Sequence, residues 1–303
     1  MARILSRPDP GLTTRARLFG DLPVAEMIRR GWLGDVEDVR NVQRVETALC
    51  KFFEASSVDE IEILPHAAKK TNVTYPATPV QLAWLYRVRQ IAADMLVPKY
   101  SKKSLYVALG NLQLLRSSPD QARKVPRILM ESGVRFIIVE SLPSSKIDGV
   151  CFWLDDNSPV IGMSLRYDRI DNFWFVVRHE LEHVLRHHGR CAAMLDVELE
   201  GERTGTTESI PLEERLANGA AAEFCVSQSA LNAFIERKAP LFYEKDILGF
   251  ARTLKIHPGL IAGQLQHRTG RYDRYRNHLV KIRSSVLPGA MVDGWGNVAS
   301  IGE

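Results

Sequence analysis

The sequence predicts a mostly helical α+β protein with one small sheet. Three observations carry this prediction. Segments with apolar residues spaced three and four apart occur in both halves of the chain, which is typical of amphipathic helices. Runs rich in β-branched residues predict three strands within 134–167. The pattern His-Glu-x-x-His at 179–183 lies in an apolar stretch directly after these runs, so we expect the sheet to pack on this helix.

Length and composition indicate an ordinary globular protein. The 303 residues suffice for one large domain or two smaller ones, and 45% hydrophobic with 25% charged residues is a typical balance. No apolar run approaches the roughly 18 residues of a membrane span, and the N-terminus shows no apolar signal segment. We therefore expect a cytoplasmic protein with no membrane partner. No C-x-x-C pair occurs, which predicts free thiols for the four cysteines, Cys50, Cys151, Cys191 and Cys225.

The first part of the chain predicts a helical N-terminal domain over 1–120. Helices are expected over 23–54 (two, split at Gly31–Gly34), 79–97 and 104–116. The stretch 56–78 is rich in Ser, Thr and Pro and predicts a connector. Ser117-Ser118-Pro119-Asp120 predicts the domain boundary.

Residues 121–283 predict a second domain that contains the sheet. A helix over 121–132 is followed by strands over 134–142, 149–156 and 159–167. Asp171 is expected to cap the histidine-bearing helix, and Gly189 to end it.

The remainder of the second domain predicts a loop and further helices. The stretch 190–210 reads as a polar loop, in which four acidic residues cluster between Asp196 and Glu202. A helix should open at Pro211 and run to about Ile235, with shorter helices over 244–254 and 258–268. Residues 284–303 are expected to form a flexible tail.

The His-Glu-x-x-His pattern predicts a metal site. His179 and His183 are four residues apart and share one helical face, so both imidazoles can reach one ion. Glu180 lies about 100° further round the helix, where it can act as a general base on water and not as a ligand. Catalytic zinc needs three protein ligands and an open fourth position.

The pattern alone does not exclude a chance occurrence without a metal site. A chain of this composition contains it by accident roughly once in a hundred, and a helix with surface histidines would look the same. The spacing also does not separate a catalytic site from a structural one. His187 and His188 suit the negative end of the helix dipole better than a ligand role. Cys191 and Cys225 could supply a thiolate to a fourth position, although buried free cysteine is the ordinary role.

Glu214 is the best candidate for a third ligand. Metzincins place Gly and His three and six residues after the second His, but this chain has Arg186 and Gly189 there. A carboxylate from a following helix is the other common solution, and Glu214 shares a face with small alanines at 217 and 221. Gly219 on the same helix also suggests close packing of two helices.

From Gly133 to about Arg283 the chain resembles the ImmA/IrrE zinc metallopeptidase-like proteins. The matching features are GVRFIIVESL, PVIGMSLR, the motif D-x-F-W-F-x-x-x-HE-x-x-H, and E-x-x-A-N at 214–218. The resemblance implies a zincin-like sheet and a Zn²⁺ site of His179, His183 and Glu214, with Glu180 as base. By analogy with zincins, strand 159–165 is expected to lie over the active-site helix and to bind a substrate backbone by strand addition. The chain is similar to longer, antitoxin-like members, but residues 1–75 show no XRE helix-turn-helix, and Phe224–Ser227 departs from the usual helix sequence.

The function implied by this resemblance is zinc-dependent cleavage of a helix-turn-helix (XRE-class) repressor by a cytosolic endopeptidase. Such cleavage would derepress stress, mobile-element or defence genes. Two alternatives remain. The fold could serve as a non-catalytic, antitoxin-like transcriptional regulator. The stretch 244–268 could be a DNA-binding helix-turn-helix, or pack on the core through Ile256 and Leu260. The basic run 252–283 has eight Lys or Arg against Asp273 and could contact nucleic acid.

Overall fold

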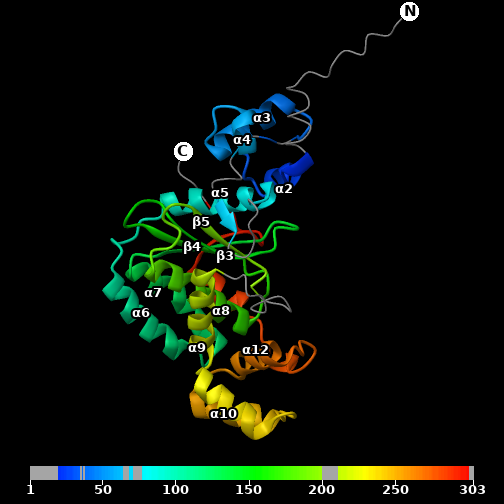
Figure 1. The fold of residues 1–303 in the computed structure, drawn as a ribbon. Helices are drawn as coiled ribbons and strands as arrows, with labels where there is room; N and C mark the ends of the chain where they lie inside the picture. The colour runs from blue at the N-terminus through cyan, green and yellow to red at the C-terminus, as the bar shows by residue number, and fades with distance from the viewer. Residues whose placement is uncertain are drawn as a thin grey trace, which may run out of the picture.

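A computed structural model describes residues 20–34, 36, 38–63, 68–70, 77–199 and 211–299 (Figure 1). The α+β prediction is confirmed: one mixed sheet lies between two layers of helices. Residues 1–19, the parts 64–67 and 71–76 of the predicted connector 56–78, and the part 200–210 of the predicted loop 190–210 lie outside the described residues. The described parts of these two stretches differ from the prediction, because the first contains helix Val58–Ile63 and strand Ala68–Lys70 and the second contains strand Ala193–Val197. Within the part of the chain that is described, no helix is long and apolar enough to cross a membrane.

The helices occupy more than half of the described residues. The longer helices are α2 Val24–Arg29, α3 Val42–Phe53, α4 Val58–Ile63, α5 Pro79–Asp94, α6 Lys102–Leu115, α7 Val125–Glu131, α8 Ile170–Leu185, α9 Leu212–Cys225, α10 Gln228–Lys238, α11 Glu244–Leu254 and α12 Pro258–Thr269. Short turns of helix follow at η2 Pro119–Lys124, η3 Arg276–His278, α13 Arg283–Val286 and η4 Leu287–Gly289. The strands are β1 Ala68–Lys70, β2 Arg135–Val139, β3 Ile147–Trp153, β4 Pro159–Met163, β5 Ala193–Val197 and β6 Met291–Asp293.

The sheet has six strands in the order β1-β5-β3-β4-β2-β6. β3 is antiparallel to both of its neighbours, and the other pairs are parallel. The three predicted strands form its centre. Since β4 pairs with β3 on one side and β2 on the other, the expectation that 159–165 binds a substrate by strand addition is wrong.

Both faces of the sheet are buried because side chains alternate between two apolar clusters. On β2, Phe136 and Ile138 face the cluster built around α8, whereas Ile137 and Val139 face the cluster around α5. On β4, Ile161 and Val160 divide in the same way. This explains why the strands read as continuous apolar runs and not as alternating ones.

Helix α5 covers one face of the sheet. It begins with a capping box between Thr78 and Gln81, which satisfies free amides at its first turn. The Gln81 side chain also donates to the Ser145 carbonyl at 2.8 Å, and the Trp84 indole donates to the Val139 carbonyl at 3.1 Å. A helix of the predicted N-terminal domain therefore packs directly on the sheet.

Helix α8 lies against the opposite face, but both of its ends differ from the prediction. It begins after Arg169 and not at Asp171, whose carboxylate receives a hydrogen bond from the Arg169 guanidinium. At its other end His187 adopts φ +59°, and the amides of 187 and 188 bond back to the carbonyls of Val184 and His183. These are the bonds of a Schellman motif, so the helix ends at His187 and Gly189 comes too late to end it.

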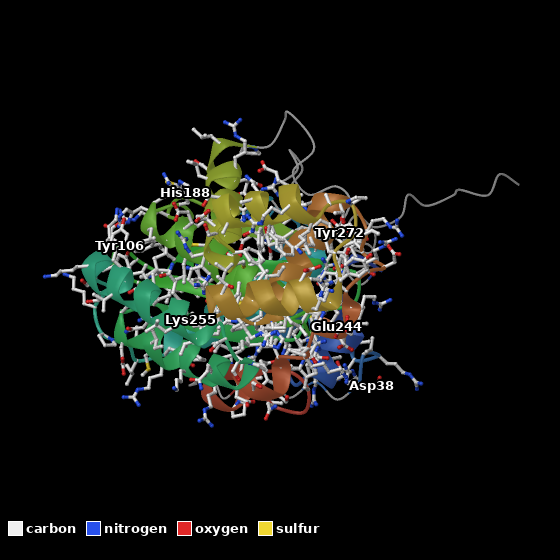
Figure 2. All side chains as sticks on the ribbon, turned by 90° about the horizontal axis from the view of Figure 1, so that it is seen from below. Asp38, Tyr106, His188, Glu244, Lys255 and Tyr272 are labelled. Carbon is white, nitrogen blue, oxygen red and sulfur yellow. The ribbon has the colours of Figure 1, made fainter. Side chains whose placement is uncertain are left out.

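The predicted helix 211–235 is two helices. The chain becomes extended at Val226, with φ −146° and ψ 130°, and α10 starts anew after Ser227. The helices predicted over 244–254 and 258–268 are present as α11 and α12, and α11 crosses the lower face of the molecule between the labelled Glu244 and Lys255 (Figure 2).

The C-terminal segment is part of the fold, in contrast to the flexible tail expected from residue 284. β6 pairs with β2, and the buried carboxylate of Asp293 accepts hydrogen bonds from the Trp32 indole at 2.8 Å and from Arg87 Nη2 at 2.5 Å. The amide of Ala299 donates to the same carboxylate at 3.2 Å. This Asp293 cluster (Asp293, Trp32, Arg87 and Ala299) joins the two ends of the described chain.

Candidate metal centre

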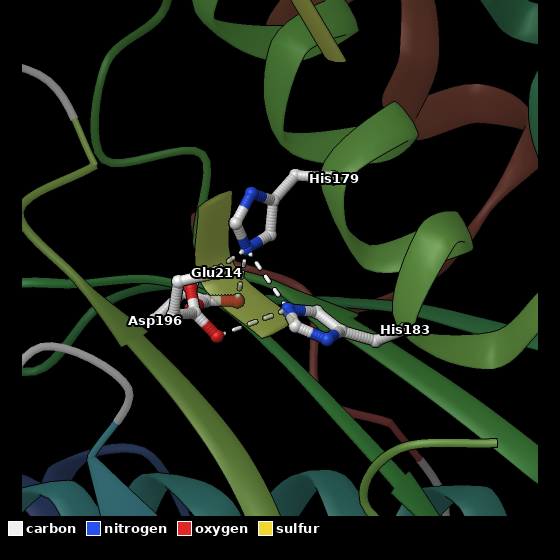
Figure 3. Close-up of side chains that lie close together, drawn as sticks. All are labelled: His179, His183, Asp196 and Glu214. Carbon is white, nitrogen blue, oxygen red and sulfur yellow. Dashed lines mark hydrogen bonds and ion pairs between the residues drawn. The ribbon is translucent and has the colours of Figure 1, made fainter. Parts of the chain in front are cut away.

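Four fully buried side chains converge at one point between the sheet, α8 and α9 (Figure 3). His179 and His183 extend from α8, Asp196 comes from β5, and Glu214 comes from the first turn of α9. One nitrogen or oxygen from each residue lies within 4.8 Å of the others. We call these four residues the metal group.

The distances from His179 Nε2 to the other three residues are close to those of a tetrahedral coordination shell, and all four donor atoms lie within 4.8 Å of one another. His179 Nε2 lies 3.0 Å from His183 Nε2, 3.2 Å from Asp196 Oδ2 and 3.4 Å from Glu214 Oε2. Donor atoms about 2.0–2.2 Å from a tetrahedral ion lie about 3.3–3.6 Å from one another. The side chains are therefore already close to the positions that an ion would require.

The hydrogen bonds of the two histidines turn their metal-binding nitrogens inward. His179 Nδ1 lies 3.0 Å from Asn218 Oδ1, an atom that only accepts, so Nδ1 carries the proton and Nε2 presents its lone pair to the metal group. His183 Nδ1 lies 2.9 Å from His188 Nδ1, which likewise leaves Nε2 of His183 toward the group. Partners of this kind fix the tautomer and orientation of metal-binding imidazoles.

Glu214 reaches the metal group because α9 lies close to α8. Ala217 and Ala221 are fully buried on the same face, as their small size predicts. Gly219 is not part of this contact: it is exposed, and no atom would meet a side chain there. Neither Glu214 oxygen accepts a hydrogen bond from the described residues. Buried carboxylates are costly without a partner, and a cation would provide one.

The electrostatics of the site favour a positive charge at its centre. Burial lowers the pKa of His179, but the carboxylates of Asp196 and Glu214 outweigh it and raise the pKa to about 10. Burial, offset in part by Asp196 and reinforced by His179, lowers the pKa of His183 to about 4. In this pair the imidazole of His179 is therefore protonated in preference to that of His183, and protonation of both is disfavoured. A metal ion would compete with that proton for the same lone pairs.

Glu180 lies beside the metal group and not within it. Its side chain is fully buried under β3, where Gly149 leaves room: a Cβ at Gly149 would overlap the Glu180 carboxylate. Burial raises the pKa of Glu180, and the neighbouring charge of Asp196 raises it further. A carboxylate whose pKa is shifted toward neutrality suits a general base.

The other sequence candidates lie outside the metal group. Cys225 is buried in the apolar cluster around α8, and Cys191 is exposed. His187 packs its ring against Trp153, with centroids 5.4 Å apart. None of these residues belongs to the metal group.

Sequence reasoning missed Asp196. It lies in a stretch that reads as a polar loop, and strand β5 forms there only because β3 and β1 supply its hydrogen-bond partners. The acidic cluster from Asp196 to Glu202 was the available signal, but it did not distinguish one buried acid from its neighbours.

Replacing Asn218 by Ala should weaken metal binding by about 10–100-fold, the usual effect of removing a partner that orients a ligand. The substitution removes the acceptor for His179 Nδ1 and frees the imidazole to rotate or change tautomer. Competition with a chromogenic chelator would measure the affinity. Asn277→Ala, far along the chain on the surface, is the control, and equal affinities for the two variants would contradict the orienting role.

Comparison with known proteins identifies the region that holds the site. Residues 131–268 match the family model of the IrrE N-terminal-like domain, a peptidase family. The matched stretch contains α8, β5 and α9, and so all four residues of the metal group. No curated protein was found to match the chain. The resemblance seen in the sequence is confirmed over these residues.

Proposed function

With residues 131–268 being an IrrE N-terminal-like domain, we propose that the chain is a zinc-dependent endopeptidase. The observation that carries this proposal is the convergence of His179, His183 and Glu214 directly beside the buried carboxylate of Glu180. A structural metal site needs ligands only. A carboxylate held next to the ligands in its own glycine-lined space suits hydrolysis.

Zinc fits the donor atoms best among common ions. Two imidazole nitrogens with carboxylate oxygens in a tetrahedral arrangement suit Zn²⁺, whereas Mg²⁺ and Ca²⁺ prefer six or more oxygen ligands. His179, His183 and Glu214 would hold the ion. When bound, it would supply a Lewis acid and lower the pKa of water. Glu180 would accept the proton at its carboxylate and pass it to the leaving amine.

We propose a helix-turn-helix (XRE-class) repressor in the cytosol as the substrate, on the basis of the resemblance to the ImmA/IrrE proteins. Cleavage would then derepress stress, mobile-element or defence genes. The strand nearest to the metal group is β5, whose outer edge pairs with β1 over Ala193–Leu195. A peptide bound to β5 by strand addition would therefore take the place of β1.

A non-catalytic regulatory role is the second candidate, and burial of the site favours it. His179, Glu180, His183 and Glu214 have no exposed surface, so a substrate cannot reach them without a rearrangement. Metal content does not separate the two functions, whereas substrate cleavage does.

DNA binding through 244–268 receives less support. The second helix of that candidate, α12, is buried along much of its length against α8, including Leu260, Ile261 and Leu265. A recognition helix needs a free face for the major groove. Contact of nucleic acid with the basic run 252–283 stays a prediction, which a steep salt dependence of duplex binding would support.

Metal content is the first test. We expect about one zinc ion per chain in the wild type, and little or none in His179→Ala and Glu214→Ala, because each removes one of the three ligands. Mass spectrometry and elemental analysis of purified protein would measure it. The exposed residues His267 and Glu213 provide matched controls as His267→Ala and Glu213→Ala. A wild type that takes up no zinc after reconstitution would refute the proposed function.

A further inference from the structure

Asp196 is a buried carboxylate whose position beside His179 is set by the pairing of β5 with β3. It lies opposite Gly149 in the antiparallel pairing of β5 with β3, so both residues face α8. Gly149 leaves the space that Glu180 fills, and Asp196 extends beside it to within 3.2 Å of His179 Nε2. Its side chain is fully buried.

A β-bulge in the neighbouring strand lies next to Asp196. The pairing of β3 and β5 shifts register between Ile147 and Gly149, which makes Asp148 the extra residue of a β-bulge. Bulges often redirect a side chain next to a functional site. Asp148 is anchored by Arg166 at 3.1 Å and accepts a hydrogen bond from the amide of Leu199 at 2.7 Å. The segment that carries Asp196 is thus fixed on both sides.

The metal group has one more donor residue than a catalytic zinc site needs. His179, His183 and Glu214 would provide three ligands, and Asp196 brings a fourth donor atom 3.2 Å from His179 Nε2, with all four donor atoms within 4.8 Å of one another. Structural zinc sites have four protein ligands, whereas catalytic sites have three and keep a position open. The four donor residues in this structure correspond to a structural zinc site, whereas a general base such as Glu180 is a feature of catalytic sites.

We propose that Asp196 is a fourth protein ligand that closes the coordination shell in this conformation, and that the site opens to substrate only when Asp196 withdraws. This inference rests on the proposed function and adds a regulated, latent state to it. The withdrawal requires the end of β5 to leave β3, which breaks the pairing of Asp196 with Gly149 and the hydrogen bond from the Leu199 amide to Asp148, whereas the pairing of β5 with β1 over Ala193–Leu195 can remain. Glu198, two residues on, already has φ +55° and marks the turn out of the strand.

Cobalt substitution tests this directly without any substrate. Co²⁺ would be loaded into the wild type, Asp196→Ala and Asp196→Asn, and its visible spectrum followed while acetohydroxamate is added. We expect the hydroxamate to perturb the spectrum of Asp196→Ala at a concentration at least about 10-fold lower than in the wild type, because only the variant has an open position. Asp196→Asn keeps the shape of the side chain and should respond like Asp196→Ala, which excludes a folding artefact.

Glu198→Ala is the matched control, since Glu198 is an acid on the same segment whose partner is the exposed Lys146 at 2.8 Å. It should behave like the wild type. If the wild type binds Co²⁺ and responds to hydroxamate as readily as Asp196→Ala, Asp196 is not a ligand and the inference fails while the proposed function stands. If the wild type binds neither Co²⁺ nor Zn²⁺, the proposed function fails and the inference with it.

Discussion

Glu180→Gln is expected to slow peptide hydrolysis by about 10²–10⁴-fold, the usual contribution of a general base. The amide retains the size of the side chain and still fits the space left by Gly149, but it cannot accept a proton. Because Glu180 is not one of the inward-facing ligands, metal content should stay at the wild-type level. Cleavage of a purified candidate repressor, followed by mass spectrometry of the fragments, would measure the rate.

The comparison needs a control for the loss of one carboxylate. Glu213→Gln serves, because Glu213 is exposed one residue before the ligand Glu214. Both substitutions should also be combined with Asp196→Ala. Hydrolysis that appears only in the Asp196→Ala background would show that the wild-type site is closed and not inactive. Hydrolysis by Glu180→Gln at the wild-type rate in both backgrounds would show that Glu180 is not the base.

Asp293→Ala is expected to lower the free energy of unfolding by about 3–5 kcal/mol, the range for breaking a buried ion pair on one side. The substitution leaves the guanidinium of Arg87 buried without its carboxylate, and it removes the acceptor of the Trp32 indole. Urea denaturation followed by circular dichroism would measure the change. Metal content should be unaffected in the folded protein, since the Asp293 cluster lies on the far side of the sheet from α8.

An exposed ion pair provides the reference. Arg271 and Asp273 are 3.0 Å apart with 52% and 64% of their side chains exposed, so Asp273→Ala should lower the free energy of unfolding far less than Asp293→Ala. Similar losses for Asp273→Ala and Asp293→Ala would mean that the Asp293 cluster adds little to stability.

Features that depend on local sequence were predictable. His179 and His183 are joined by one helical turn, and the position of Glu214 follows from a face that it shares with Ala217 and Ala221. The three central strands are rich in β-branched residues. Each of them lies between two other strands of the sheet and is almost entirely buried. These elements carry their own signal in a few adjacent residues.

Features that depend on distant partners were not predictable. β1 and β6 have three residues each, too few for a periodicity, and β5 is as long as β2 and β4 but has Val197 as its single β-branched residue. All three strands depend on another strand that lies alongside. Asp196 belongs to the metal group through its place on β5, so a sequence reading that misses the strand also misses this residue. The end of α8 was misplaced for a related reason, since His187 takes the left-handed conformation that glycine usually occupies.

The Asp293 cluster also affects the order in which the protein assembles. Its contacts join residues more than 200 positions apart, whereas the metal group spans only His179 to Glu214. Contacts between distant residues close late in folding because a long loop must be ordered first. We therefore expect the α8–α9 contact to form before β6 docks and joins the N-terminal helices to the sheet.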